Sequence, residues 1–490
     1  MGSSMAIIFR KKIKYILAFA GCLLLLQSIY YTWQVITIGA AYKAKVLCSG
    51  VFISMRSPQD IMREDLESVL GMIDAKIDLA MKSVTTSFPG MPSQRAVFRG
   101  RLGCTLLAGA SDAEVLRYGG DVGMLVLPSP AQQREPIGLR GLGKVLPPKV
   151  SPDKLANALD KAFSEKNAHN PANTKAVIVV YDGRMIVERY AAGISANTAL
   201  AGWSLAKSVT NALVGILVFQ GKLSIDQPVP LPEWSGTGDP RKSITLDHLL
   251  RMCSGLKFDE TSGPFVSDVN LMLLRSRDAA AYALAKPLKY EPGSHWQYSS
   301  GTTNIISRII RDSVSGNIAD YHAFPRKALF DKIGMTSAVM EVDAAGTFVG
   351  SSFIYATARD WARFGLLYMQ DGVWNGERIL PPGWVSYSTK PTPAAQSRPY
   401  GAHFWLNRND MITGKEKLLE KLPPDTFYAS GYEGQNVVII PSRKVVIVRL
   451  GLTRNGNAWD MESFIFDVLA AIATNENASG SKQTVRIPPG

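Results

Sequence analysis

The apolar positions near the N-terminus form one long run, whereas those of the remaining chain recur at helix or strand spacing. The run extends from Tyr15 to Leu26 and continues less strongly to about Ala41. Four basic residues precede it: Arg10, Lys11, Lys12 and Lys14. Because a helix of about 20 apolar residues crosses a bilayer and a positive flank stays cytoplasmic, we predict a membrane anchor here.

A cleaved signal peptide is the alternative interpretation of the same segment, since Ala40 and Ala41 are small enough for a cleavage site. That site lies well beyond the strongest apolar run, and Tyr30, Tyr31 and Trp33 are typical of interface anchors. The pattern therefore favours an uncleaved anchor. The expected location is a bacterial inner membrane with the remaining chain in the periplasm, or a secreted or periplasmic protein if cleavage occurs.

The 490 residues are sufficient for more than one domain. We predict an anchor or signal over residues 1–43, followed by an N-terminal extension with a linker over 44–150. A larger domain is predicted over 151–475 and a flexible tail over 476–490. The sequence indicates no oligomeric state.

The extension shows local patterns but no recognisable chemistry. Five apolar positions predict one amphipathic helix: Leu66, Val69, Leu70, Ile73 and Ile77. Residues 95–107 resemble short strands about a glycine turn, and the Pro- and Gly-rich segment 135–150 is typical of a linker or an extended loop.

Strands are predicted at both ends of the larger domain. Residues 175–190 are two β-type runs about Asp182-Gly183, which is a strong hairpin signal. Residues 436–441 and 444–451 are two more strands about a short turn.

Helices fill the rest of this domain. One begins at Ser151 and Pro152, the middle of the chain from about 244 to 390 is mostly helical, and residues 458–473 form a closing helix. A sheet made from both ends of the domain, with helices between them, predicts an α/β sandwich with an all-helical lobe.

The composition changes this picture little. An apolar fraction of 46% and a charged fraction of 19% are typical of a globular protein. The net charge is +13, but no block of six basic residues and no nucleic-acid motif occurs, so we expect a basic surface and no nucleic-acid partner. No Cys/His cluster has zinc-site spacing, and we expect neither a metal nor another cofactor.

Four cysteines lie at positions 22, 48, 104 and 253. Cys22 falls in the apolar run, and Cys253 falls in a helix-like pattern that predicts a small buried residue. Cys48 and Cys104 both follow the anchor, in a region where a disulfide can persist. A bridge between them stays open, because sequence alone does not bring two Cα atoms within reach.

The segment WSLAKS (203–208) opens a strongly apolar helix in which Ser204 and Lys207 share one face. A serine becomes a nucleophile when a base takes its proton, and burial lowers a lysine pKa enough for lysine to be that base. The helix N-terminus also aims N–H groups at developing negative charge. Alone, the pattern fits a solvent-exposed helix face equally well.

Two further segments carry groups suited to the same chemistry. Tyr298 in EPGSHWQYSSG follows a Pro-Gly turn, where a tyrosine can protonate a leaving group or anchor the loop as a half-buried ring. In YASGYEGQNVVII, Gly431 permits close backbone approach, so that the N–H groups of Tyr432 and Ser204 can form an oxyanion hole. An ordinary turn into a strand has the same pattern.

Together these segments resemble the penicillin-recognising serine hydrolases, which include class C β-lactamases, DD-peptidases and β-lactamase-like esterases and amidases. The motifs that carry the resemblance are Trp203-Ser204-x-x-Lys207, Tyr298-Ser299-Ser300 and Ser430-Gly431. The segments GKLSIDQPV, LLRMCSGLKF and YATARDWARFG are similar to the branch of 6-aminohexanoate-dimer hydrolases and related carboxylesterases. The resemblance covers about residues 151–475. It implies a β-lactamase/transpeptidase-like α/β fold, with an antiparallel sheet flanked by helices and an all-helical lobe.

The resemblance also implies roles for individual residues. Ser204 would be the acylated nucleophile, Lys207 its general base and Tyr298 an acid/base partner. The N–H groups of Ser204 and Tyr432 would hold the oxyanion. The substrate-contacting positions of the family fall on three residues: Ser300, Ser430 and Gly431.

Two departures from the family pattern bear on the substrate. Ala429-Ser430-Gly431 stands where β-lactamases and DD-peptidases carry Lys-Thr-Gly or His-Thr-Gly, which removes the cation that pairs with a substrate carboxylate. Ser300 stands where class C enzymes have asparagine. Both changes favour an esterase or amidase acting on a small ester, amide or short peptide.

Three alternatives stay open. One is a membrane-tethered penicillin-binding-like module without turnover, and the second is a true β-lactamase or DD-peptidase. The third is an α/β-hydrolase, because residues 202–206 are one residue short of a Gly-x-Ser-x-Gly elbow. That fold requires a late histidine base, and the last histidine, His403, has no evident acidic partner in the sequence.

Overall fold

The computed structural model describes residues 2–472 except 67, 118–145, 166, 168–169, 264, 315, 397, 409–416, 418 and 455. The predicted tail at 476–490 lies outside the described residues, as do positions 135–145 of the predicted linker.

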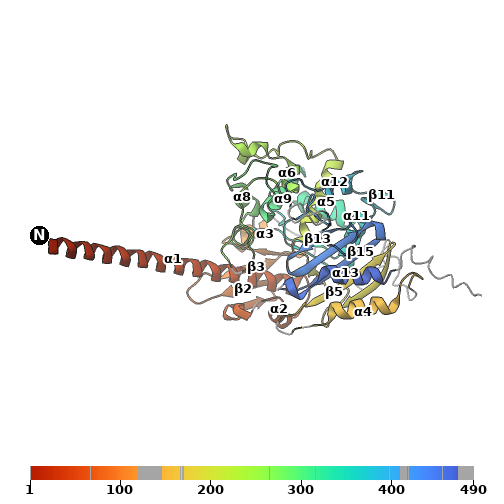
Figure 1. The fold of residues 1–490 in the computed structure, drawn as a ribbon, viewed down its shortest axis with the longest axis horizontal. Coiled ribbons are helices and arrows are strands. Elements are labelled where there is room, and N and C mark those ends of the chain that lie inside the picture. The colour runs from red at the N-terminus through yellow and green to blue at the C-terminus, as the bar shows by residue number, and fades with distance from the viewer. Residues whose placement is uncertain are drawn as a thin grey trace, which may run out of the picture.

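Helix α1 (Gly2–Phe52) leaves the body as a long rod and continues into it (Figure 1). From residue 12 to residue 32 its side chains are exposed, and from residue 36 onward most are buried or half-buried. Within the described part of the chain, this is the one helix long and apolar enough to cross a membrane, as a span or a signal. The helix passes through residue 43, where the sequence places the end of the anchor.

The inner part of α1 packs on a four-stranded antiparallel sheet with the order β1-β2-β3-β4. Its strands are β1 (Asp74–Asp78), β2 (Ser83–Ser87), β3 (Gln94–Phe98) and β4 (Cys104–Leu106). Two short helices flank it, α2 (Pro58–Glu64) and α3 (Asp112–Arg117). The strands predicted within residues 95–107 are therefore confirmed as β3 and β4.

The amphipathic helix predicted from Leu66 to Ile77 is wrong. A short 3₁₀ turn covers Ser68–Met72, and strand β1 follows it. Leu66, Leu70 and Ile77 all pack in one cluster with side chains of α1, but they reach it from a turn and a strand. Their spacing matches one face of a helix by coincidence, because each side chain is buried under α1 from its own position in a turn or a strand.

The larger domain contains a six-stranded antiparallel sheet with the order β12-β13-β14-β15-β5-β6. Its strands are β5 (Thr174–Tyr181), β6 (Arg184–Tyr190), β12 (Trp405–Leu406), β13 (Phe427–Gly431), β14 (Gln435–Ile440) and β15 (Val445–Gly451). The predicted hairpins, β5 to β6 about Asp182-Gly183 and β14 to β15, are confirmed. Strands from both ends of the domain meet where β15 pairs with β5.

Both faces of this sheet are buried, because successive side chains of a strand point to opposite sides. Ile178 and Val180 of β5 pack against α5 (Leu205–Phe219) and α11 (Ala358–Met369). Their neighbours Val177 and Val179 pack against α4 (Pro152–Phe163) and α13 (Met461–Ala470). These layers confirm the predicted sandwich and both predicted flanking helices (Figure 1).

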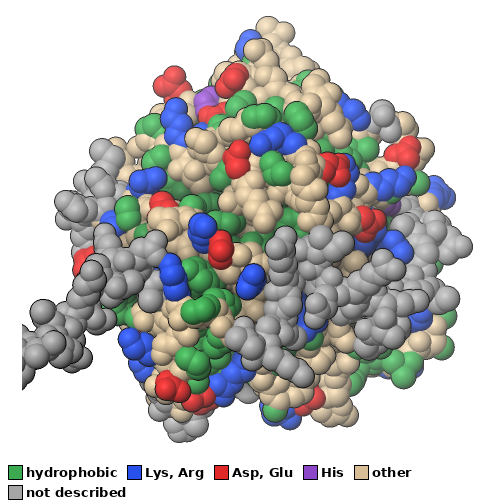
Figure 2. All heavy atoms as spheres, turned by 90° about the vertical axis from the view of Figure 1, so that its right-hand side faces the viewer, with side chains coloured by type: hydrophobic (Ala, Val, Ile, Leu, Met, Phe, Trp, Pro, Cys, Tyr) green, Lys and Arg blue, Asp and Glu red, His purple; other side chains and the backbone are tan. Residues whose placement is uncertain are grey.

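The regular structure in the middle of the chain is mostly helical, with long loops between the helices, as predicted. Its helices are α6 (Leu246–Leu250), α7 (Asp268–Leu274), α8 (Ala279–Leu284), α9 (Ser300–Ser313), α10 (Ile318–Pro325) and α12 (Trp384–Ser388). Small sheets interrupt them, with strands β7 (Leu200–Ala201), β8 (Val339–Met340), β9 (Ile354–Ala356), β10 (Val373–Trp374) and β11 (Glu377–Arg378). On the face of the body turned away from the free end of α1, basic and acidic side chains are interspersed (Figure 2).

Candidate active site

The turn before α5 fixes the position of Ser204. Trp203 has a φ of 49°, in a left-handed conformation that costs an L-residue about 1–3 kcal/mol. The rings of Tyr42, Phe353 and Tyr432 surround its indole, with centroids 5.7–6.2 Å away. Ser204 occupies the N-cap of α5, yet its hydroxyl does not cap the helix and is left for other partners.

Lys207 lies one turn further along α5 and is 1% exposed. Its Nζ lies 3.0 Å from Ser204 Oγ, 3.1 Å from Ser300 Oγ and 3.0 Å from the carbonyl oxygen of Ser351. Burial lowers the pKa of Lys207 to about 8, and the negative charge of Glu260 acts in the opposite direction. A large share of this amine is therefore neutral near pH 8.

Glu260 determines where the protons of this cluster lie. Its carboxylate accepts the backbone N–H of Ser300 at 2.7 Å and also the Ser300 hydroxyl. Because that hydroxyl gives its proton to Glu260, its oxygen can only accept from Lys207. The Ser351 carbonyl can likewise only accept. A neutral amine has two N–H bonds and one lone pair, so its lone pair is left for the Ser204 hydroxyl.

Sequence reasoning missed Glu260. It stands 40 residues before Ser300 in an ordinary loop, and no spacing rule connects the two. Burial raises the pKa of Glu260, whereas Lys207 and the two hydrogen bonds from Ser300 lower it. The predicted substrate-contacting residue Ser300 thus lines the site as the link between Glu260 and Lys207.

Tyr298 meets the same pair of residues from the opposite loop. Its ring centroid lies 4.7 Å from Lys207 Nζ, and its hydroxyl is hydrogen-bonded with Ser204. The ring stacks on Trp405 at 5.5 Å and meets Tyr400 edge-on at 6.0 Å. Burial, with a smaller contribution from Glu260, raises the pKa of Tyr298, so the group is a neutral phenol at physiological pH and a proton donor.

The end of β13 lies against the serine turn. A Cβ atom on Gly431 would come within 2.2 Å of the carbonyl oxygen of Gly202, so only glycine permits this approach. Ser430 and Tyr432, on either side of Gly431, line the same cavity as Ser204. Ser430 Oγ also accepts a hydrogen bond from Asn436 at 3.3 Å.

His403 lies beneath α5. Its Nδ1 donates to the carbonyl oxygen of Lys207 at 2.8 Å, and its Nε2 lies 3.2 Å from the hydroxyl of Thr303. Burial lowers the pKa of His403 to about 3. A histidine held in this way supports the helix backbone, unlike the base of an α/β-hydrolase, which must face its serine.

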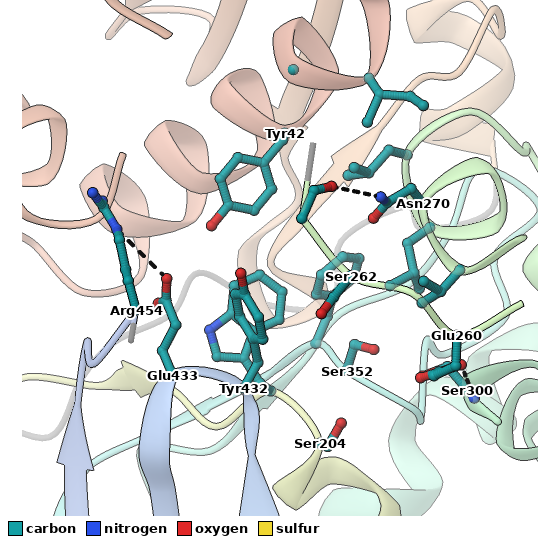
Figure 3. A pocket seen from close by; sticks show the side chains of 18 of the residues that line it. Tyr42, Ser204, Glu260, Ser262, Asn270, Ser300, Ser352, Tyr432, Glu433 and Arg454 are labelled. Carbon is teal, nitrogen blue, oxygen red and sulfur yellow. Dashed lines mark hydrogen bonds and ion pairs between the residues drawn. The ribbon is translucent and has the colours of Figure 1, made fainter. Parts of the chain in front are cut away.

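A cavity of about 510 Å³ opens above Ser204, and its roof comes from α1 and the N-terminal extension. Figure 3 shows Tyr42 pointing down from α1 over Tyr432, with Ser204 on the floor and Glu260 beside Ser300. Glu433 and Arg454 form an ion pair of 3.8 Å at one edge. The sequence assigned no chemistry to the extension, because the residues that form this roof carry no reactive motif.

Two buried contacts hold α1 in place: an ion pair with the larger domain and a disulfide with β4 of the extension. Lys45 of α1 forms an ion pair with Glu341, which also accepts Ser49 Oγ at 2.8 Å and the N–H of Cys104 at 2.6 Å. A disulfide joins Cys48 to Cys104, with Cα atoms 6.0 Å apart, and both residues are fully buried. Within the part of the chain that the structure describes, no group of three His, Cys, Asp or Glu side chains is arranged to hold a metal ion.

Comparisons with known proteins match the larger domain. The family model described as Beta-lactamase matches residues 159–468, which is more than half of the chain. A 6-aminohexanoate-dimer hydrolase from Paenarthrobacter ureafaciens is 25% identical over 300 residues, covering 56% of this chain and 72% of that protein.

Solved structures show the same fold at lower identity. A family VIII carboxylesterase has a TM-score of 0.51 and 15% identity, covering 67% of this chain and 98% of its own. A penicillin-binding protein homologue from Caulobacter crescentus has a TM-score of 0.50 and 18% identity, covering 66% and 98%. The matched family region begins after the extension that roofs the cavity.

Proposed function

Because this chain belongs to the beta-lactamase family of serine hydrolases, we propose that it cleaves an ester or amide bond through a covalent acyl-enzyme at Ser204. The observation that carries the proposal is the 3.0 Å contact between Ser204 Oγ and the buried amine of Lys207. A buried lysine with a pKa of about 8 can act as a general base at physiological pH.

Each residue of the site has its own step in the proposed reaction. Lys207 takes the Ser204 proton as Oγ attacks the substrate carbonyl, and the N–H groups of Ser204 and Tyr432 bind the oxyanion. The Tyr298 phenol then protonates the leaving oxygen or nitrogen, and the proton held by Lys207 returns to Tyr298. Water next attacks the acyl-enzyme by the same route, so that the acid product leaves and Ser204 regains its proton.

The substrate bond is an ester or an amide rather than a β-lactam. Ala429 stands where β-lactamases and DD-peptidases carry the cation that pairs with a substrate carboxylate. The matched proteins include, by name, a 6-aminohexanoate-dimer hydrolase and a family VIII carboxylesterase. We also place the body outside the inner membrane, with the exposed part of α1 as anchor, because a buried disulfide suits an oxidising compartment.

Labelling of the full-length protein with a fluorophosphonate probe tests the proposal, with p-nitrophenyl acetate hydrolysis as a second readout. We expect the probe on Ser204, and Ser204→Ala should lose both label and turnover. Ser195→Ala, at an exposed serine outside the cavity, is the matched control and should keep both. Undiminished hydrolysis by Ser204→Ala would overturn the mechanism, and a wild-type protein inert to both reagents would favour a binding module without turnover.

A further inference from the structure

The cavity above Ser204 is walled largely by hydrocarbon. Its apolar lining includes Val35, Ile36 and Ile38 of α1, Ile73 and Phe88 of the extension, and Leu273 of α7. A volume of about 510 Å³ lies within the range of about 300–1,000 Å³ that encloses small organic ligands. Much of this wall therefore suits an apolar part of a substrate.

The cavity extends along α1. Tyr42 marks the end next to the nucleophile, because its ring stacks on Trp203 at 6.2 Å. Val35 lies seven residues earlier on the same helix, which corresponds to about 10 Å of rise. The cavity is thus longer than a small acyl group such as acetate requires.

The far end of the cavity lies near the exposed part of α1. Tyr31 is four residues before Val35, or about 6 Å along the helix, and is 47% exposed. From residue 31 back to residue 12 the side chains of α1 are exposed, and this stretch has the composition of a membrane span. A ligand lying in the cavity therefore ends close to the surface that a bilayer would cover.

One group of polar side chains surrounds the nucleophile. Ser204, Glu260 and Ser300 line the floor, and the Glu433–Arg454 ion pair lies at the edge beside β13 (Figure 3). Elsewhere Asp65, Ser262 and Asn270 interrupt the apolar wall, and Asn270 donates to the carbonyl oxygens of Gly263 and Phe265. A ligand that matches the cavity therefore has a polar group near Ser204 and a long apolar chain.

We infer that the substrate is a long-chain acyl ester or amide, whose hydrocarbon chain lies along α1 while its carbonyl carbon meets Ser204 Oγ. This inference rests on the proposed acyl-enzyme function and adds the substrate class to it. Amphiphiles of this class reside in bilayers, which explains why the roof of the cavity belongs to the same helix as the membrane-type segment. The bond from the carbonyl carbon to the leaving oxygen or nitrogen is broken by the steps already given for Ser204.

The test compares p-nitrophenyl decanoate with p-nitrophenyl acetate as substrates of the full-length protein in one detergent. Each buried methylene contributes to binding, so we expect kcat/KM to be at least about tenfold higher for decanoate. Val35→Trp fills the far end of the cavity and should reduce the decanoate-to-acetate ratio by about tenfold. Ile29→Trp adds the same ring on the exposed part of α1, where Ile29 is 57% exposed, and should keep the wild-type ratio.

A second cavity variant shows whether a lower ratio comes from filling the cavity or from a local change in α1. Leu273→Trp fills the cavity from α7 and should reduce the ratio as Val35→Trp does. A wild-type protein that hydrolyses acetate without preferring decanoate overturns this inference alone, as does a preference that survives both cavity variants. A protein that hydrolyses neither ester and takes no fluorophosphonate on Ser204 overturns the proposed function as well.

Discussion

The floor and the roof of the cavity are held in place by different forces. On the floor, Lys207 Nζ lies 3.0–3.1 Å from three oxygen atoms. The ability of the amine to act as a base therefore depends on its protonation and on the direction of these hydrogen bonds. In the roof, α1 presents apolar side chains and is fastened by an ion pair and a disulfide away from the cavity floor. Under the proposed function, the reaction and the choice of substrate therefore reside in separate parts of the chain and can be altered separately.

An aromatic contact joins the two parts next to the nucleophile. Tyr42 of the roof stacks on Trp203, whose strained backbone precedes the nucleophile. The family match at residues 159–468 contains the floor and leaves out α1. Changes on the floor should therefore reduce the turnover of every ester, whereas changes in the roof should affect stability and substrate size.

The largest effect is expected for Lys207→Ala. Loss of the general base should reduce kcat for p-nitrophenyl acetate on the order of 10⁴-fold. Lys222→Ala removes an exposed lysine just after the same helix and should keep the wild-type rate. Steady-state kinetics of the two variants measure the contrast, and a Lys207→Ala rate within tenfold of wild type would rule out this base.

The floor could be predicted from the sequence because short motifs encode it. Ser204 and Lys207 are one helical turn apart, so local spacing places them on one face, whereas Tyr298 and Tyr432 joined them through the resemblance of the combined motifs to a known family. The sheet was predicted for a similar reason, since each hairpin carries its own turn signal.

The roof could not be predicted, because its contacts join distant positions. Lys45 and Glu341 are 296 residues apart, and no periodicity connects them. The same cause explains why Glu260 was missed and why the helix from Leu66 to Ile77 was wrong. Each of these residues is placed by a partner from another element, which a local pattern does not contain.

The next effect concerns the attachment of the roof. Lys45→Met leaves Glu341 as a buried charge without its cation, and breaking a buried pair costs about 3–5 kcal/mol of unfolding free energy. We expect a clear fall in the thermal unfolding midpoint followed by circular dichroism. Lys45→Met combined with Glu341→Gln removes both charges and should recover part of the loss. Equal stability of the single variant and wild type would show that the pair does not fasten α1.

A smaller loss is expected when the disulfide is removed. The bridge closes a separation of 56 residues, and such bridges contribute about 2–4 kcal/mol. Cys48→Ser with Cys104→Ser should lower the unfolding midpoint and make it insensitive to reductant, while Cys22→Ser should leave it unchanged. Hydrolysis of p-nitrophenyl acetate should persist in the double variant below its midpoint, since no floor residue is altered. Loss of turnover in a folded double variant would contradict the separation of floor and roof.

The smallest effect is expected in the pH dependence of kcat/KM, which reports the protonation of Lys207 on the floor. The neutral amine of Lys207 is the active form, so kcat/KM should rise with pH and level off above a pKa of about 8. The charge of Glu260 raises that pKa, and Glu260→Gln should therefore move the rising limb to lower pH. The neutral amide oxygen of the variant also accepts the hydrogen bond from the Ser300 hydroxyl less strongly than a carboxylate does. The plateau of kcat/KM should therefore fall about tenfold.

The direction of the shift separates this role from simple structural support. A residue that only stabilised the loop would lower the plateau and leave the limb near pH 8, because the environment of Lys207 would not lose a charge. Asp259→Asn removes the neighbouring exposed carboxylate and should leave the limb in place, since Asp259 does not contribute to the pKa shift of Lys207. A rising limb that moves to higher pH in Glu260→Gln would mean that Glu260 does not act on Lys207 through its charge. The proposed hydrogen-bond arrangement, in which the lone pair of Lys207 faces Ser204, would then be wrong as well.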